Sequence, residues 1–136
     1  MGMLANRVHI GLFVADIAKM VAFYRDILGF EAEWDGGPFA RFKVNDGGLF
    51  MFDRKQFAED MHQPYIAPQG YNQSMEIGLD VPTMADVDRE YARLMALGVN
   101  SVLEPTTQPW GQRNFWISDP EGNYIEVGSF GESAGG

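Results

Sequence analysis

Three ionisable side chains lie in short strand-like segments and have the chemistry to bind a metal or to move a proton. They are His9 in HIGLFV, Glu76 in EIGLDV and Glu126 in NYIEV. The chain contains two histidines and no cysteine, which excludes a disulfide, a thiolate nucleophile and a thiolate metal site. Histidine, aspartate and glutamate remain the strong metal ligands, so any metal would be held by nitrogen and oxygen.

The segments that carry His9 and Glu76 are copies of an internal repeat. HIGLFV at residues 9–14 recurs as EIGLDV at residues 76–81. Side chains alternate between the two faces of a strand, so the aliphatic residues of each copy are predicted to pack against a helix. His9, Glu76 and, by the same alternation, Glu126 are then expected on the opposite, uncovered faces of the sheets.

A helix is predicted after each copy. Asp16 and Thr83 have side chains that cap the first turn of a helix, and Gly29 and Gly98 supply the left-handed backbone that ends one. Between these signals, apolar residues recur at helical spacing. The two apolar stripes are Met20, Phe23, Tyr24, Ile27 and Leu28 in the first helix and Val87, Tyr91, Leu94 and Met95 in the second.

Three strand-like segments follow each helix, so each half of the chain is predicted to be a βαβββ module. The predicted strands are 30–34, 39–44 and 49–53 in the first half and 101–104, 113–118 and 123–128 in the second. Turn-forming clusters at 45–48 and 119–123 join the last two strands of each half. Module one covers about 7–54, module two about 73–130, and residues 131–136 form a fraying tail.

The linker between the modules, residues 55–72, shows no clear period. It is interpreted as a crossover, a lid, or a short helix around residues 56–61, and His62 within it as a surface histidine. A module of this size is too small to bury its apolar surface alone, so the two modules are expected to pair.

Length and charge exclude several function classes. A chain of 136 residues fits one compact domain or two fused half-size modules. Its 19 acidic residues against 10 basic ones give a net charge of −9, which argues against binding to nucleic acid. No apolar run is long enough to cross a membrane, and the first residues show no leader signal. The expected compartment is therefore the cytoplasm, with no membrane partner.

Three stretches of the chain resemble the vicinal oxygen chelate superfamily, which includes glyoxalase I, bleomycin-resistance proteins and extradiol dioxygenases. They are HIGLFVAD at residues 9–16, FYRDILGF at 23–30 and DPEGNYIE at 119–126. The resemblance implies an α+β fold of paired βαβββ modules, in which a curved mixed sheet surrounds a cavity and the helices lie on its outer face. It also implies one glyoxalase-like domain over residues 1–136 and a homodimer.

The resemblance assigns a divalent metal site to His9, Glu76 and Glu126, with Zn, Ni, Mn, Fe, Co or Mg as the ion. Two positions depart from glyoxalase I. Glu76 stands where a histidine is usual, and Met51 is matched to Glu126 in the first module, where a carboxylate is usual. One imidazole and two carboxylates leave coordination positions open for adjacent substrate oxygens. The alternative is that these residues bind no metal. His9 would then be a hydrogen-bonded histidine in the cavity, and Glu76 and Glu126 would be solvated side chains.

Four residues are predicted to border the substrate: Met51, Trp110, Trp116 and Arg41. Trp110 lies in QPWG at residues 108–111, a loop that resembles one in bleomycin-resistance-like proteins. A tryptophan there either stacks on a flat ligand or anchors the loop over the sheet edge. Trp116 is expected to form part of the cavity wall, and Arg41 to meet an anionic substrate.

The resemblance leaves more than one function open. The leading hypothesis is a glyoxalase-like, metal-dependent lyase or isomerase that chelates adjacent oxygens of a small molecule, with Glu126 as the general base. The alternative is a metal-free dimer that sequesters a drug, as bleomycin-resistance proteins do. A third interpretation is a degenerate domain whose pocket is only structural.

Overall fold

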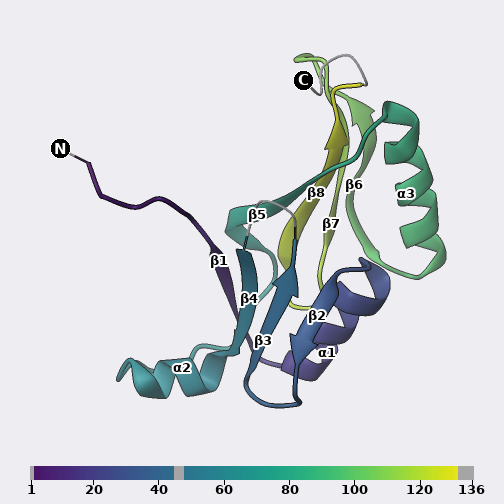
Figure 1. Ribbon diagram of the computed structural model, residues 1–136. Coiled ribbons are helices and arrows are strands. Elements are labelled where there is room, and N and C mark those ends of the chain that lie inside the picture. The colour runs from purple at the N-terminus through teal and green to yellow at the C-terminus, as the bar shows by residue number, and fades with distance from the viewer. Residues whose placement is uncertain (1, 45–47, 132–136) are drawn as a thin grey trace. The chain divides into compact units, whose positions relative to one another are not determined.

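The computed structural model describes residues 2–44 and 48–131, which divide into two compact units with a boundary between Pro68 and Gln69 (Figure 1). Both units contain the βαβββ order that the internal repeat predicts, so the predicted α+β fold is confirmed. The first unit contains β1 (Ile10–Val14), α1 (Ile17–Ala22) continued by a π-helical turn (Phe23–Ile27), β2 (Glu31–Trp34), β3 (Phe39–Lys43), β4 (Gly48–Asp53) and α2 (Arg54–Asp60). The second contains β5 (Asn72–Asp80), α3 (Met84–Ala96), β6 (Asn100–Thr107), β7 (Arg113–Ser118) and β8 (Asn123–Ser129).

Each unit has one four-stranded mixed sheet. The strand order is β1-β4-β3-β2 in the first unit and β5-β8-β7-β6 in the second. In both sheets the first strand pairs in parallel with the last, and the other pairs are antiparallel. The two sheets therefore have the same topology, as a repeat of one module requires.

The core of the first unit lies between α1 and one face of its sheet. Asp16 caps the helix by accepting a hydrogen bond from the backbone N–H of Lys19 at 3.1 Å. Met20 and Tyr24 are fully buried, and the Tyr24 ring lies 5.7 Å from the ring of Phe42 on β3. Gly29, with a φ of 84°, ends the helical segment as predicted.

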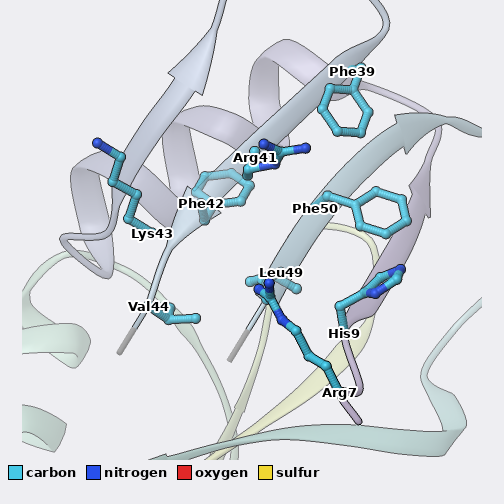
Figure 2. Close-up of a pocket in the computed structure, with 10 residues that line it drawn as sticks. Arg7, His9, Phe39, Arg41, Phe42, Lys43, Val44, Leu49 and Phe50 are labelled. Carbon is cyan, nitrogen blue, oxygen red and sulfur yellow. The ribbon is translucent and has the colours of Figure 1, made fainter. Parts of the chain in front are cut away.

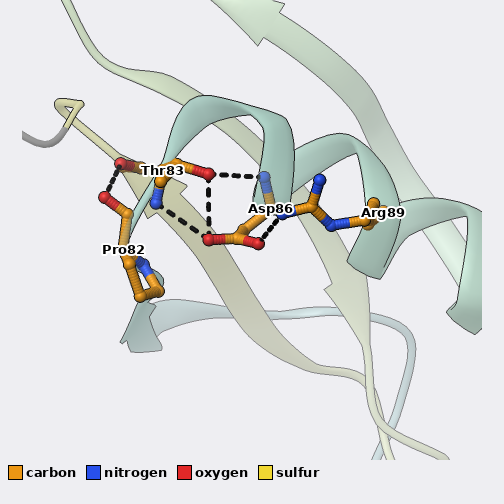
Figure 3. A network of polar contacts seen from close by, with 5 residues as sticks. Pro82, Thr83, Asp86 and Arg89 are labelled. Atoms are coloured by element: carbon orange, nitrogen blue, oxygen red, sulfur yellow. Dashed lines mark hydrogen bonds and ion pairs between the residues drawn. The ribbon is translucent and has the colours of Figure 1, made fainter.

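The core of the second unit lies under α3, which packs against β6, β7 and β8. The helix begins with a capping box, in which Thr83 Oγ1 accepts from the backbone N–H of Asp86 at 3.0 Å and Asp86 Oδ2 accepts from the backbone N–H of Thr83 at 3.0 Å (Figure 3). Phe115 and Ile117 on β7 are fully buried. Gly98, with a φ of 77°, ends the helix.

The first strand is shorter than predicted. β1 begins at Ile10, so His9 precedes the strand instead of belonging to it. The prediction that the aliphatic residues of the first copy pack under the helix is wrong for Ile10, which is 38% exposed, and Val8 just before this copy is 81% exposed. Only Leu12 and Val14 of this set are buried. The strand is limited by its partner β4, which pairs with it from Ile10 onward.

The linker contains the predicted short helix, α2. Phe57 on this helix stacks on Phe13 with ring centroids 3.9 Å apart, so α2 covers part of the sheet face opposite α1. His62 follows α2, is exposed and has a φ of 55°, which agrees with its interpretation as a surface histidine. No helix in the described ranges is long and apolar enough to cross a membrane.

The turn between β7 and β8 has the predicted conformation. Asp119 Oδ1 accepts from the backbone N–H groups of Glu121 and Asn123 at 2.9 and 3.0 Å. Gly122 has a φ of 86° and no room for a Cβ atom, because the carbonyl oxygen of Gly70 occupies that position. The corresponding turn of the first unit, at residues 45–47, and the predicted tail at 132–136 lie outside the described residues.

Candidate functional site

The first unit has a pocket of about 550 Å³ on the sheet face opposite α1 (Figure 2). Alternation along β3 places Phe39 and Arg41 on this face, while Ala40 and Phe42 are buried on the helix side. Arg41 pairs across the sheet with Phe50 on β4, and His9 is also part of the lining. The pocket therefore contains two residues that the sequence singled out, Arg41 and His9.

Three rings form a continuous row in this pocket, and we call Phe39, Phe50 and His9 the aromatic row. Phe39 and Phe50 are stacked with ring centroids 5.6 Å apart, and His9 lies 5.5 Å from Phe50. The guanidinium carbon of Arg41 lies 5.7 Å from the Phe39 ring centroid, within the range of a cation–π contact. The row presents ring surface with a cation at one end.

Among the described residues that line the pocket, the charged ones are all basic. Lys43 forms ion pairs with Glu31 and Glu33 at 3.6 and 3.3 Å, and these raise the pKa of its ammonium group. Figure 2 shows that Lys43 points away from the aromatic row. Within the described part of the chain, neither Arg7 nor Arg41 forms an ion pair with a carboxylate.

The second unit brings Glu76 and Glu126 together on the face of its sheet opposite α3, and we call them the carboxylate pair. Glu126 on β8 pairs across the sheet with Gly78 on β5, two residues beyond Glu76. A Cβ atom placed on Gly78 would lie 3.7 Å from Glu126 Oε1, so this oxygen lies over bare backbone. Trp116 Nε1 donates a hydrogen bond to Glu76 Oε1 at 3.1 Å.

A buried amide orients Glu126. Asn114 is fully buried on β7, and its Nδ2 donates to Glu126 Oε2 at 2.8 Å and to Gln112 Oε1 at 3.0 Å. Gln112 Oε1 also accepts from Trp110 Nε1 at 2.9 Å, and Asn114 Oδ1 accepts from Gln108 Nε2 at 3.0 Å. This network connects the QPWG loop to the carboxylate pair.

The environment of Glu126 favours its protonated form. Burial raises the pKa of the Glu126 carboxyl most, and the hydrogen bond from Asn114 opposes this. Glu76 raises the same pKa further through its charge and a hydrogen bond, and the charge of Asp80 adds to the effect. A carboxyl with a raised pKa next to a second carboxylate is a common feature of functional sites.

The structure corrects the match between the two modules. Gly11 pairs with Phe50, whereas the corresponding Gly78 pairs with Glu126. The residue that corresponds to Glu126 is therefore Phe50, and the match to Met51 is wrong by one position. Met51 is fully buried on the helix side of its sheet, so its side chain packs in the core and does not border the open face.

Trp110 and Trp116 differ in their surroundings. Trp110 is 60% exposed in the loop between β6 and β7, and its hydrogen bond to Gln112 fits the interpretation of a loop anchor. Trp116 lies beside Glu76 on the open face of the second sheet. Sequence reasoning missed Asn114 and Gln112 as site residues, although a polar residue next to Phe115 in an apolar strand is a signal for a buried hydrogen bond.

The donor set for a metal is limited in the described residues. In residues 2–44 and 48–131, no three or more histidine, aspartate or glutamate side chains form a group that could hold a metal ion. The carboxylate pair supplies two oxygen ligands in one unit, and His9 lies in the other. Two carboxylates fit a hard divalent cation that takes its remaining ligands from water or substrate.

Comparisons with known proteins identify relatives over nearly the whole chain. Residues 7–127 match the family model of the Glyoxalase/Bleomycin resistance protein/Dioxygenase superfamily. The uncharacterized protein YraH of Bacillus subtilis (strain 168) is 30% identical over 122 residues, which are 88% of this chain and 94% of that protein.

Solved structures share the fold. A glyoxalase/bleomycin resistance protein/dioxygenase from Nocardioides superposes with a TM-score of 0.82 at 22% identity, covering 100% of this chain and 89% of that one. Lactoylglutathione lyase from Agrobacterium tumefaciens superposes with a TM-score of 0.72 at 25% identity, covering 98% of this chain and 100% of that one.

Proposed function

Because this chain belongs to the glyoxalase/bleomycin resistance protein/dioxygenase superfamily, we propose that it is a glyoxalase-like, metal-dependent enzyme. The reaction is of the lyase or isomerase type, and the substrate is a small molecule with adjacent oxygen atoms. The observation that carries the proposal is the carboxylate pair, in which Glu126 has a raised pKa and is held by Asn114.

Glu76 and Glu126 would hold a divalent ion, with His9 as the third ligand implied by the family resemblance. The hydrogen bonds from Trp116 and Asn114 to the two carboxylates support this role, because ligating carboxylates are usually oriented by a second set of donors. A bound divalent cation would stabilise negative charge on the substrate's oxygens. The metal is one of Zn, Ni, Mn, Fe, Co or Mg.

Glu126 is the proposed general base. Its Oε2 is engaged by Asn114, and its Oε1 lies over Gly78, which has no side chain. A carboxyl with a raised pKa accepts a proton from substrate more readily than an ordinary glutamate does. Asn114 is a positioning residue, because its hydrogen bond fixes the direction of the Glu126 carboxylate.

Metal analysis of protein purified without a metal-affinity tag tests the proposal. We expect about one equivalent of a divalent metal per chain, lost in both Glu126→Gln and His9→Ala. Glu104→Gln, at an exposed glutamate on β6, is the matched control and keeps the metal. Isomerisation of a glutathione hemithioacetal is the first activity to assay. A Glu126→Gln protein with full metal content and full turnover would refute the mechanism.

A second candidate is a protein that sequesters a small molecule or drug without catalysis. The observation that favours it is Phe50, which places an aromatic ring where a fourth metal ligand would stand in glyoxalase I. Binding of a drug that survives both a chelator and His9→Ala supports sequestration, whereas chelator-sensitive turnover supports the enzyme. Neither stoichiometric metal nor a ligand-induced thermal shift is expected if the pocket is only structural.

We also propose that the protein forms a homodimer in the cytoplasm, as short members of the superfamily commonly dimerise. Sedimentation equilibrium measures the mass directly. A mass twice that of the 15.2 kDa chain supports the proposal, and a monomer at all concentrations contradicts it.

A further inference from the structure

We propose that the pocket of the first unit binds an organic oxyanion, a carboxylate or a phosphate, attached to a flat apolar body. The aromatic row would hold the flat body, and Arg7 and Arg41 would hold the oxyanion. This inference rests on the proposed function, because it names the substrate class of the site that contains His9. The binding itself needs no metal, so it can be tested separately.

The aromatic row is shaped to receive a flat molecule. The Phe50 ring lies across Gly11, where an added Cβ atom would be 2.7 Å from ring atom Cε2. Only a glycine therefore allows the ring to lie this close to β1. Phe39 stacks beside it at 5.6 Å, and Phe39 is 40% exposed. Exposed stacked rings offer a surface on which another aromatic or flat group gains dispersion energy.

A second glycine brings the cation of Arg7 to the same pocket. A Cβ atom on Gly48 would lie 2.9 Å from His9 Cβ and 3.1 Å from a terminal guanidinium nitrogen of Arg7. The backbone of β4 is thus bare where Arg7 and His9 pass over it. Figure 2 shows Arg7 beside His9, and Arg41 on the strand that carries Phe39, next to the strand that carries Phe50.

The positive charge of the lining favours a ligand with negative charge. The chain as a whole carries a net charge of −9, but among the described residues 2–44 and 48–131 no acidic residue lines this pocket. Guanidinium groups bind carboxylates and phosphates through paired hydrogen bonds, and Arg7 and Arg41 are not engaged by carboxylates in the described residues. A large polyanion is excluded because the rest of the chain repels it, whereas a small anion can enter.

The volume of the pocket agrees with a ligand of this kind. At about 550 Å³, it falls inside the range of about 300–1,000 Å³ that small-molecule sites usually have. The combination of ring surface and two arginines disfavours a planar cation, which would meet like charges. Sequestration of a cationic drug at this pocket is therefore not expected.

Isothermal titration calorimetry on chelator-treated protein tests the inference with four naphthalene probes of nearly equal size. Naphthoate and naphthyl phosphate carry the oxyanion, naphthamide is neutral, and naphthylmethylamine is a cation. We expect both anions to bind at least about tenfold more tightly than the amide, and the amine to bind most weakly. The stronger of the two anions identifies the preferred source of the oxyanion.

Variants assign the binding to the pocket. Arg41→Gln and Arg7→Gln are each expected to weaken naphthoate binding about five- to tenfold and to leave naphthamide binding unchanged. Arg41→Lys keeps the charge and recovers part of the affinity. Lys55→Gln removes one positive charge from the exposed face of α2, outside the pocket, and should leave naphthoate binding unchanged.

The inference is overturned if naphthamide or the amine binds as tightly as naphthoate, or if both arginine variants bind naphthoate like the unmodified protein. Thermal unfolding of each variant checks that it is folded, and exposed Arg41 is not part of the core.

Metal content separates the two proposals. Naphthoate binding without a bound metal in the purified protein supports this inference and counts against the proposed enzyme, and a metal without anion selectivity does the reverse.

Discussion

Glu126 is held in a conformation that its own position in β8 does not determine. Its carboxylate direction depends on Asn114, which is buried one strand away and is itself fixed by Gln108 and Gln112. An Asn114→Ala variant would lose three side-chain hydrogen bonds at once. The chemistry of the carboxylate pair thus depends on a neutral amide that has no reactivity of its own.

The raised pKa of Glu126 predicts a pH-dependent effect of Glu126→Gln on stability. A carboxyl with a higher pKa in the folded than in the unfolded state stabilises the fold at low pH, and this contribution is lost as the pH rises through the folded value. In metal-free protein, we expect Glu126→Gln to raise the thermal midpoint at pH 7.5. The difference from the unmodified protein should shrink as the pH falls toward about 4.3, the usual pKa of glutamate.

Glu104→Gln is the control for this measurement, because Glu104 is exposed on β6 and has no part in the carboxylate pair. Its effect on the midpoint should not change in the same pH window. A lower midpoint for Glu126→Gln at pH 7.5 would contradict the predicted direction.

The paired glycines Gly11 and Gly78 predict unequal costs for the same substitution. Gly11→Ala places a Cβ atom 2.7 Å from Phe50 Cε2 and forces the ring out of the aromatic row, whereas the nearest atom to a Cβ on Gly78 is at 3.7 Å. Urea unfolding should show that Gly11→Ala costs about 1–3 kcal/mol and that Gly78→Ala costs clearly less. Equal costs would mean that Phe50 moves freely.

The double variant Gly11→Ala with Phe50→Ala completes the experiment. Because Phe50→Ala removes the obstructing ring, the two substitutions together should cost less than the sum of the single costs. Additive costs would show that the alanine at position 11 acts through the strand backbone and not through the ring.

At the scale of elements, the helix ends are the features that depend most on single residues. The capping box of α3 joins Thr83 and Asp86 through two hydrogen bonds from a backbone N–H to a side-chain oxygen and one between their side chains. Arg89 extends the cluster by an ion pair with Asp86 (Figure 3). The start of α3 is therefore fixed close to the end of β5.

Thr83→Ala is predicted to destabilise the protein by about 1 kcal/mol, because it removes the side-chain acceptor of the Asp86 N–H and the hydroxyl that donates to Asp86 Oδ2. Thr83→Ser keeps the hydroxyl and should recover most of the loss. Chemical unfolding of both variants measures the difference. Equal destabilisation by serine and alanine would show that the methyl group, and not the hydrogen bond, is responsible.

The order and bounds of the elements could be predicted from sequence where the signals are local. β7 spans the predicted residues because Phe115 and Ile117 alternate with Asn114, Trp116 and Ser118 between two turns. Both helices end at their predicted glycines for a similar reason. Alternation and capping are properties of neighbouring residues, and a single sequence contains them.

The register of the sheets could not be predicted in this way. His9 was expected inside the first strand, but that strand starts where β4 begins to pair with it. The match of Met51 to Glu126 failed because it also depends on pairing between strands. The two modules differ in length, so the corresponding residue is identified only by the pairing of Gly11 with Phe50. The hydrogen bond from Asn114 to Glu126 also joins different strands.

At the scale of the whole molecule, the dominant property is the excess of negative charge. Nineteen acidic residues against 10 basic ones repel one another in the folded state. Against this background, the basic lining of the first unit's pocket is a local reversal of sign. The net charge of the chain is negative, whereas the described lining of this pocket carries positive charge.

The net charge predicts that moderate salt stabilises the protein. At an ionic strength of 0.15 M, charges more than about 8 Å apart are largely screened, which weakens the repulsion in the folded state. We expect the thermal midpoint to rise when sodium chloride is raised from about 10 mM to about 150 mM, because the Debye length falls from about 30 Å to about 8 Å. Sucrose at equal osmolality is the control, and a falling midpoint in salt would contradict the prediction.

Gly11 and Gly78 occupy the same position of the repeat, yet one faces an aromatic ring and the other an acid. If the halves arose by duplication of an ancestral gene, this position has diverged without altering the surrounding scaffold. Each copy is then free to accumulate changes of its own, so new ligand preferences can evolve in one half while the reactive group in the other is conserved.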